Sequence, residues 1–235
     1  MDTFFKILYM PAEAFQALKG RNKFPWMSLI LLLVVVIINN ILLIPVTVKV
    51  SELSLTSMSL PISDEQIETT MKFMYKIRYL QVVGAFFMYI FMLVVYTLII
   101  WILTKIAKRS LSFQKTFELV IHCCFVLAIG ALVNTFVLYE QGIENIKNMF
   151  EISLTGLNLL TSVESVGVVF YTFLSLINPF YVWFVVLLTI GLSILTGMKH
   201  IKAFIISFIF WIMIIAYSVI SVYFAYALMI RKGLI

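Results

Sequence analysis

The sequence predicts an all-α, polytopic integral membrane helical bundle, and three observations support this fold class. Hydrophobic residues make up 63% of the 235 residues, whereas charged residues make up 12%. Soluble domains carry about 45–50% apolar and about 25% charged residues, so water is the wrong solvent for this chain. The apolar residues also occur in long uncharged runs, and only 5 prolines interrupt the chain. We therefore expect helices that satisfy their own backbone hydrogen bonds in lipid.

Five apolar runs are long enough to cross a bilayer, since about 20 residues at ~1.5 Å each cover ~30 Å of hydrocarbon. A sixth run, residues 166–177, is too short to cross, and we interpret it as an interfacial or re-entrant piece. We expect Pro45 to kink the outer end of the first span and Pro179 to bend the chain before the fourth. The five expected spans cover residues 26–48, 80–104, 119–139, 180–197 and 203–230.

The charges between the spans predict a cytoplasmic N-terminus. With that orientation the cytoplasmic segments hold ten basic and three acidic residues, and the outer segments hold seven basic and eight acidic residues. Basic residues collect on the cytoplasmic side of membrane proteins. Arg231 and Lys232 at the outer C-terminus depart from this rule, and a topology with six spans would suit them better.

Residues 1–25 are expected to form a short amphipathic helix on the cytoplasmic side. Pro11 suits the first position of a helix. In one interpretation the helix lies on an anionic leaflet, with Lys19, Arg21 and Lys23 near the lipid headgroups. In the other, the same basic residues serve only to keep this end of the chain inside. The apolar residues at near-helical spacing are Phe4, Leu8, Phe15 and Leu18.

The first outer segment, residues 49–79, is expected to begin as a polar loop and to end as a helix. Ser63 and Gln66 fit a capping box, in which each side chain bonds to the backbone N–H of the other residue. No proline follows before the end of the second span, so we expect one unbroken helix over residues 64–104. Its apolar face should pack either on the second outer segment, residues 140–178, or on a partner protein.

No pattern in the sequence indicates an active site. His122, Cys123 and Cys124 are adjacent, and neighbouring side chains on a helix point about 100° apart, so they cannot all face one metal ion. Phosphate-binding loops, zinc-protease motifs and carboxylates deep within a span are absent from the sequence. We therefore predict no catalytic residue, metal or cofactor. The net charge of +6 lies in short loops rather than on one basic face, so we expect no nucleic-acid partner.

Four polar residues within or beside the apolar runs are predicted to hydrogen-bond between helices: Asn39, Asn40, Asn134 and His122. Such bonds are worth ~0.6–2 kcal/mol each in a membrane. The alternative interpretation of the three amides is a polar pocket for a solute.

Four short stretches carry a family resemblance by their order and spacing. They are Pro-Ala-Glu-Ala-Phe at 11–15, Ser-Phe-Gln-Lys-Thr-Phe at 112–117, Phe-Tyr-Val-Trp at 180–183 and Ile-Gly-Leu at 190–192. Together they resemble the Yip family, the Ypt/Rab-interacting integral membrane proteins, in its bacterial form. The resemblance implies one membrane domain over residues 1–235, five spans, an outer C-terminus and a place in the bacterial plasma membrane. The family supplies no catalytic residues.

The leading hypothesis for function is a non-enzymatic scaffold or accessory subunit of a membrane complex. The resemblance implies one specific role of this kind, because some bacterial relatives look like accessory subunits of ABC-type exporters. The alternative is a passive carrier or channel for an apolar or lipid-like solute. The expected partners are the lipid bilayer and either another membrane protein or a second copy of this chain.

Overall fold

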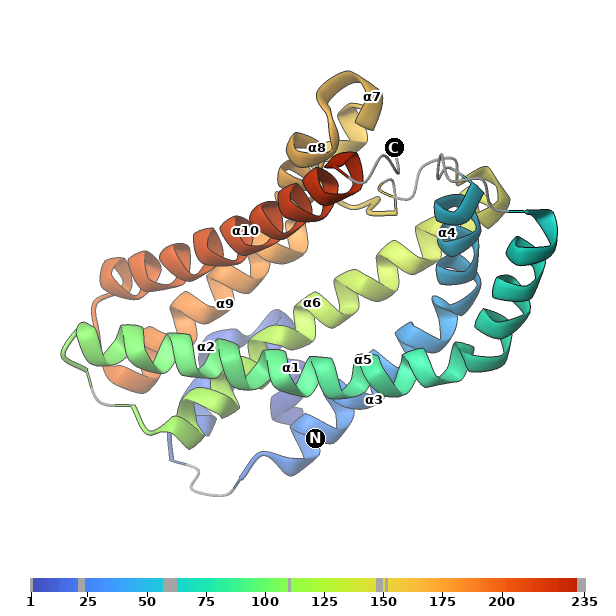
Figure 1. The fold of residues 1–235 in the computed structure, drawn as a ribbon. Helices are drawn as coiled ribbons and strands as arrows, with labels where there is room; N and C mark the ends of the chain where they lie inside the picture. Colours follow the sequence, from blue (N-terminus) through green and yellow to red (C-terminus); the bar gives the residue numbers. More distant parts are fainter. Residues whose placement is uncertain are drawn as a thin grey trace. The chain divides into compact units, whose positions relative to one another are not determined.

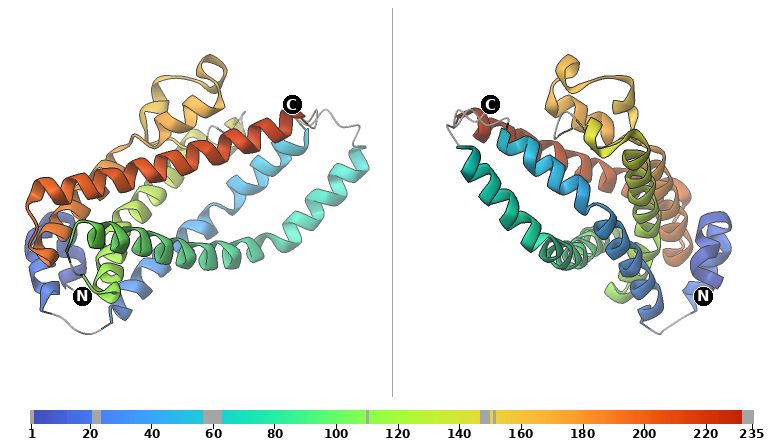
Figure 2. Two further views of the ribbon diagram at one scale, coloured as in Figure 1. Left: turned by 60° about the vertical axis from the view of Figure 1, so that its left-hand side comes forward. Right: turned by 90° about the vertical axis from the view of Figure 1, so that its right-hand side faces the viewer.

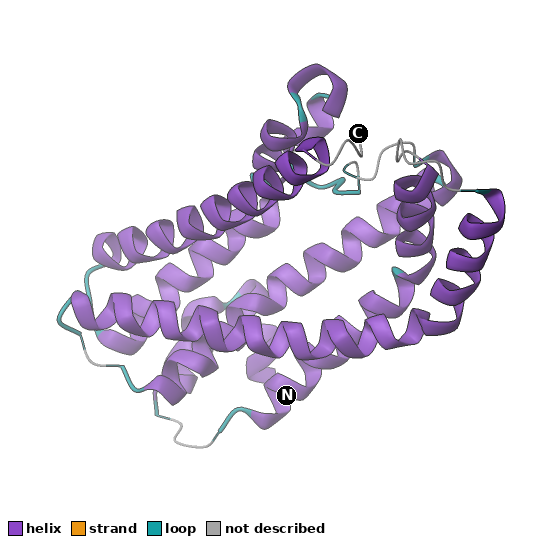
Figure 3. Cartoon of the chain, viewed as in Figure 1, coloured by secondary structure: helices purple, strands orange, loops and turns teal. Residues whose placement is uncertain are grey.

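The computed structural model describes residues 2–20, 24–56, 63–109, 111–146, 150 and 152–231. Every regular element within these ranges is a helix (Figure 3). The elements in chain order (Figure 1) are α1 (Asp2–Tyr9), α2 (Pro11–Lys19), α3 (Trp26–Leu42), α4 (Ile44–Thr56), α5 (Asp64–Ile106), α6 (Phe113–Gln141), η1 (Ile143–Asn145), η2 (Leu157–Leu160), α7 (Val163–Val166), α8 (Val168–Ser175), α9 (Pro179–Thr196) and α10 (His200–Arg231).

The predicted fold class, an all-α membrane bundle, is confirmed. Four of the described helices, α5, α6, α9 and α10, are long and apolar enough to cross a bilayer. A fifth crossing is present if α3 and α4 together count as one bent span. The helices α9 and α10 are separated by three residues, where Gly197 adopts a φ of +68° that ends α9.

The first span bends in its outer half, beside Pro45, where the sequence predicts a kink. The helix α3 ends at Leu42 and α4 begins at Ile44, with their axes at 48° to one another. Pro45 is the second residue of α4, where a missing N–H removes no hydrogen bond from the helix. The loop predicted from Lys49 onward is wrong as far as Thr56, because α4 continues through these residues.

Local side-chain pairs explain why α4 continues through this polar sequence. Lys49 Nζ lies 3.3 Å from a carboxylate oxygen of Glu52, one turn ahead, and 3.5 Å from one of Glu144 in η1. The Ser51 hydroxyl donates to the Thr47 carbonyl at 2.8 Å. These polar groups are therefore satisfied within α4 or by the neighbouring η1 and do not need a loop conformation.

The long helix α5 runs unbroken over the range that the sequence predicts and ends at Ile106. At its start the Ser63 N–H donates to Gln66 Oε1 at 3.2 Å, and the Gln66 N–H donates to Ser63 Oγ at 3.3 Å. This reciprocal pair occupies two backbone N–H groups that would otherwise have no partner at the helix start. The polar N-terminal part of α5 is therefore a continuation of the apolar span.

The chain divides into two compact units, and each has its own packing. The helices α3, α5, α6 and α10 contribute residues to both units. The core of unit 1 contains fully buried aromatic and aliphatic side chains such as Phe15, Phe184 and Phe210. Unit 2 has a smaller core around Val163, Val168 and Tyr171. Unit 1 comprises Met1–Val36, Phe86–Gly130 and Pro179–Ile214, and unit 2 comprises Ile37–Ala85, Ala131–Asn178 and Ile215–Ile235.

The N-terminal segment of unit 1 is a pair of short helices rather than one. The helices α1 and α2 lie next to one another (Figure 2), and α2 packs along α9. Ile7, Phe15 and Leu18 are at most 1% exposed. The apolar face of this segment, which one interpretation of the sequence places on a lipid leaflet, is therefore buried within the protein. Lys19 is exposed at the end of α2, whereas Arg21 and Lys23 lie outside the described residues.

The short apolar run before the fourth span forms no membrane crossing of its own. It folds as α7 and α8, which Gly167 separates with a φ of +78°. The eight residues of α8 are too few to cross ~30 Å of hydrocarbon. Pro179 begins α9, so it starts a helix instead of bending one.

We expect Thr70→Pro to break the N-terminal part of α5. Proline in a helix interior removes a backbone hydrogen bond and costs ~3 kcal/mol or more. Amide hydrogen exchange of the full-length protein in detergent should then accelerate over residues 64–78, because a helix end that has lost its continuity frays. The control is Thr70→Ala at the same exposed position. Equal protection in the two variants would contradict the unbroken helix.

Candidate functional site

A close helix contact in unit 1 holds the N-terminal pair in place. Gly191 of α9 faces Phe15 of α2 and Leu119 of α6. A Cβ atom at Gly191 would overlap the Leu119 side chain and would lie 3.0 Å from Cζ of Phe15. The missing side chain therefore leaves the space that the Leu119 side chain and the Phe15 ring fill.

A lysine on α6 bonds to the end of the same helix α2. Lys115 Nζ donates to the Leu18 carbonyl at 2.6 Å and to Glu118 Oε2 at 3.0 Å. The last carbonyls of a helix have no partner within the helix, and positive charge is favourable beside them. Glu118 is 3% exposed, and its second oxygen, Oε1, has no hydrogen-bond partner among the described residues. The hydrogen bond from Lys115 to the Leu18 carbonyl thus ties α2 to the start of α6, and Glu118 on the same helix pairs with the lysine charge.

His122 is a packed polar residue that links α3 to α6. It is 1% exposed, with Nδ1 2.7 Å from the Glu118 carbonyl and Nε2 3.2 Å from Ser28 Oγ. Since a carbonyl only accepts, Nδ1 donates to the Glu118 carbonyl, and Nε2 hydrogen-bonds with the serine hydroxyl. Among the described residues no group of three or more His, Cys, Asp or Glu could hold a metal ion.

The predicted amides have different roles in unit 2. Asn39 Oδ1 accepts from Thr135 Oγ1 at 2.8 Å, which joins α3 to α6. Asn134 bonds to the segment after α6 and, among the described residues, not to a second helix, so the prediction of a bond between helices is wrong for it. Its Nδ2 donates to the Ile152 carbonyl at 2.9 Å, and its Oδ1 accepts from the Leu154 N–H at 2.6 Å. Asn134 therefore anchors the segment that follows α6. Asn40 is half-buried on α3.

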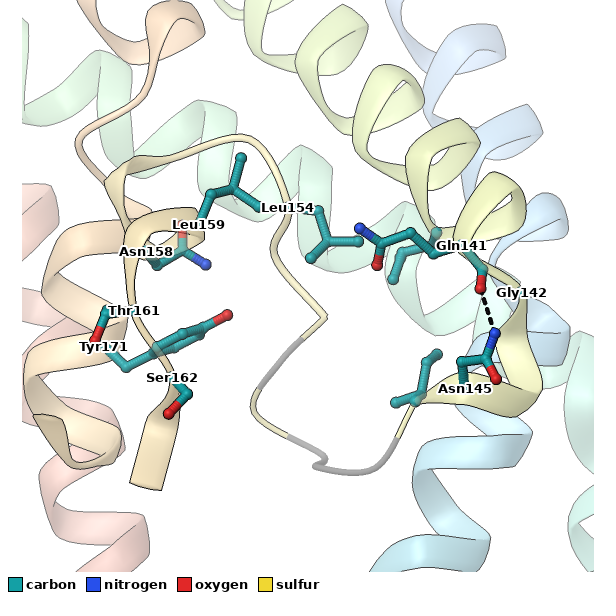
Figure 4. Close-up of a pocket in the computed structure, with 11 residues that line it drawn as sticks. Gln141, Gly142, Asn145, Leu154, Asn158, Leu159, Thr161, Ser162 and Tyr171 are labelled. Carbon is teal, nitrogen blue, oxygen red and sulfur yellow. Dashed lines mark hydrogen bonds between the residues drawn. The ribbon is translucent and has the colours of Figure 1, made fainter. Parts of the chain in front are cut away.

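The segment anchored by Asn134 leads into a cavity of about 260 Å³, which we call the amide pocket (Figure 4). The end of α6, the turn around η1, η2 and α8 all contribute to its wall. The lining residues are Leu138, Gln141, Gly142, Asn145, Ile146, Leu154, Asn158, Leu159, Thr161, Ser162 and Tyr171.

A glycine contact positions Asn158 in the pocket wall. A Cβ at Gly156 would lie 2.6 Å from the Ser175 carbonyl and 2.9 Å from the Leu174 carbonyl, so only glycine lets the chain approach the end of α8. Asn158 follows two residues later and is fully buried. Its Nδ2 donates to the Ser153 carbonyl at 2.5 Å, whereas its Oδ1 has no hydrogen-bond partner among the described residues.

The pocket residues were not predicted from the sequence. Amides, serines and threonines in a segment between two spans are ordinary loop residues, and no fixed spacing connects Gln141 with Asn158 and Tyr171. The sequence feature that could have indicated a folded pocket here is the set of glycines in this segment. Gly142, Gly156 and Gly167 all lie between the third and fourth spans, and Gly142 and Gly167 have positive φ angles. Turns of this kind indicate a folded segment rather than a plain connection.

Comparison with known families gives one match over most of the chain. Residues 5–222 match the family model described as the Yip1 domain. No curated protein and no solved structure matches the chain significantly. The matched range extends from α1 into α10, so it includes both the contact at Gly191 and the amide pocket.

We expect Gly191→Val to release the N-terminal pair of helices. The valine side chain would overlap the Leu119 side chain and crowd the Phe15 ring, and neither buried group can move without loss of packing. Limited proteolysis and hydrogen exchange of residues 2–20 should therefore increase. The matched control is Gly84→Val on α5, where an added Cβ meets no atom within 4 Å. Unchanged protection in the Gly191 variant would refute the close contact.

Proposed function

Because the chain belongs to the Yip1 domain family of multi-pass membrane proteins, we propose that it is a non-enzymatic scaffold or accessory subunit of a membrane complex. We place it in the bacterial plasma membrane with a cytoplasmic N-terminus. Its partner would be a second membrane protein, and an ABC-type exporter is the specific partner that the resemblance of bacterial relatives suggests.

The observation that carries this proposal is the exposure of α5. Only 17% of the residues in its most apolar stretch are buried, compared with 56% in α6. Phe87 and Phe91 lie one turn apart on α5 and are 65% and 61% exposed. Aromatic side chains are enriched at the energetically important positions of protein interfaces. A span with so little contact to its own chain is suited to bind a helix of another protein.

The use of the intramembrane polar groups supports a scaffold over an enzyme or a carrier. Both ring nitrogens of His122 and both amide atoms of Asn134 already have partners within the chain. Asn39 is bonded to Thr135. A solute path needs polar side chains that can bond to the solute in place of their present partners. Each hydrogen bond broken for this purpose costs free energy. The structural roles of these residues therefore favour a fixed framework.

Photo-crosslinking in native membranes tests the proposed role of α5. We expect a benzophenone side chain at Phe91 to give a discrete adduct with one other protein, which mass spectrometry would identify. The control is the same side chain at Ile212 of α10, which is 46% exposed. Adducts with lipid alone at both positions would contradict the proposal that α5 binds a partner.

Cysteine labelling in intact cells tests the proposed orientation. In a background with Cys123→Ala and Cys124→Ala, we expect an impermeant maleimide to label Thr70→Cys. It should not label Ser112→Cys until the membrane is opened, because the two exposed positions would lie on opposite sides. The reverse pattern would place the N-terminus outside and overturn the orientation.

A further inference from the structure

The size of the amide pocket limits what it can hold. Its volume is about 260 Å³. Pockets for drug-sized ligands measure about 300–1,000 Å³, so this pocket lies just below the small end of that range. That room suits one small ring with its substituents. A whole lipid or a folded segment of another protein would not fit.

The chemistry of the wall selects for an uncharged ligand. Among the residues that the structure describes, the pocket lining includes no Asp, Glu, Lys, Arg or His. A charged ligand would lose its hydration without meeting an opposite charge, which is strongly unfavourable. Phosphates, carboxylates and ammonium groups are therefore poor occupants.

The polar groups of the wall can both donate and accept hydrogen bonds. Figure 4 shows the Gln141 amide directed inward from one side of the pocket, and Asn158 and Tyr171 on the opposite side. Hydroxyl groups of a ligand also donate and accept, so they complement primary amides in either direction. In addition, Asn158 Oδ1 is a buried acceptor without a partner among the described residues, so a donor that reached it would be favourable.

We propose that the amide pocket binds one uncharged polyhydroxyl ring of hexose size, either free or as the headgroup of a glycolipid. The hydroxyl groups would bond to Gln141, Asn158 and the neighbouring Thr161 and Ser162. The apolar C–H face of the ring would contact Leu159. The proposal goes beyond the scaffold function and does not depend on it. The amide pocket and the exposed side chains of α5 are separate features, and different experiments test them.

Binding can be measured with the full-length protein in lipid nanodiscs. We expect methyl glucosides or methyl galactosides to show saturable binding by saturation-transfer NMR, whereas glucuronate and inorganic phosphate should not bind. A second set of nanodiscs contains a glycosyl diacylglycerol in place of part of the phospholipid. If the free sugar binds less well in these discs, the glycolipid headgroup competes for the pocket and is the better ligand. If binding of the free sugar is undiminished, the free sugar is the ligand.

Two variants assign the binding to the pocket. Gln141→Ala should weaken the sugar about five- to tenfold, as expected for the loss of one or two hydrogen bonds. Leu159→Trp should abolish binding by filling the cavity, and Leu159 is 55% exposed, so the fold can accept a larger side chain there. The matched control is Gln114→Ala, an exposed glutamine near the other end of α6. Absence of saturable binding, or equal affinity in all three variants, would overturn the proposal.

Discussion

Backbone groups in hydrocarbon have no water to bond with, and this constraint decides where the chain can deviate from a helix. The long spans satisfy it by continuing without interruption, as α5 does for 43 residues. Breaks occur where another group meets the need. At the junction of α3 and α4, the missing N–H of Pro45 falls where a helix start needs no donor, and the Thr47 N–H still reaches the Leu43 carbonyl at 2.9 Å.

Side chains satisfy the backbone groups that helix ends leave without a partner. Lys115 satisfies a terminal carbonyl of α2, and Asn134 pairs with both a carbonyl and an N–H of the segment after α6. Both are polar residues that a hydropathy count treats only as interruptions. In this protein they hold irregular backbone against regular helices, which is a different role from joining two spans.

The sequence was informative wherever one local rule acted alone. The extent of α5 follows from a capping pair and the absence of proline, and the spans follow from the length of the uncharged apolar runs.

Prediction failed where the outcome depended on residues far apart in the chain. The apolar face of α2 carries no mark that distinguishes burial against Gly191 from burial in lipid, since both require the same spacing of Phe15 and Leu18. Likewise, no local pattern reveals that Asn134 bonds to residues 18 and 20 positions later.

The bond from Lys115 to the Leu18 carbonyl constrains the length of α2 more than its composition. A backbone carbonyl is present whatever side chain occupies position 18, so this hydrogen bond tolerates substitution there. Removal of one residue between Phe15 and Leu18 is a different matter. It would turn the carbonyl by about 100° around the helix axis and shift it along the axis by ~1.5 Å. Members of the family that keep this bond should therefore vary in the residues of the exposed face of α2 while retaining the number of residues from the buried aromatic ring to the helix end.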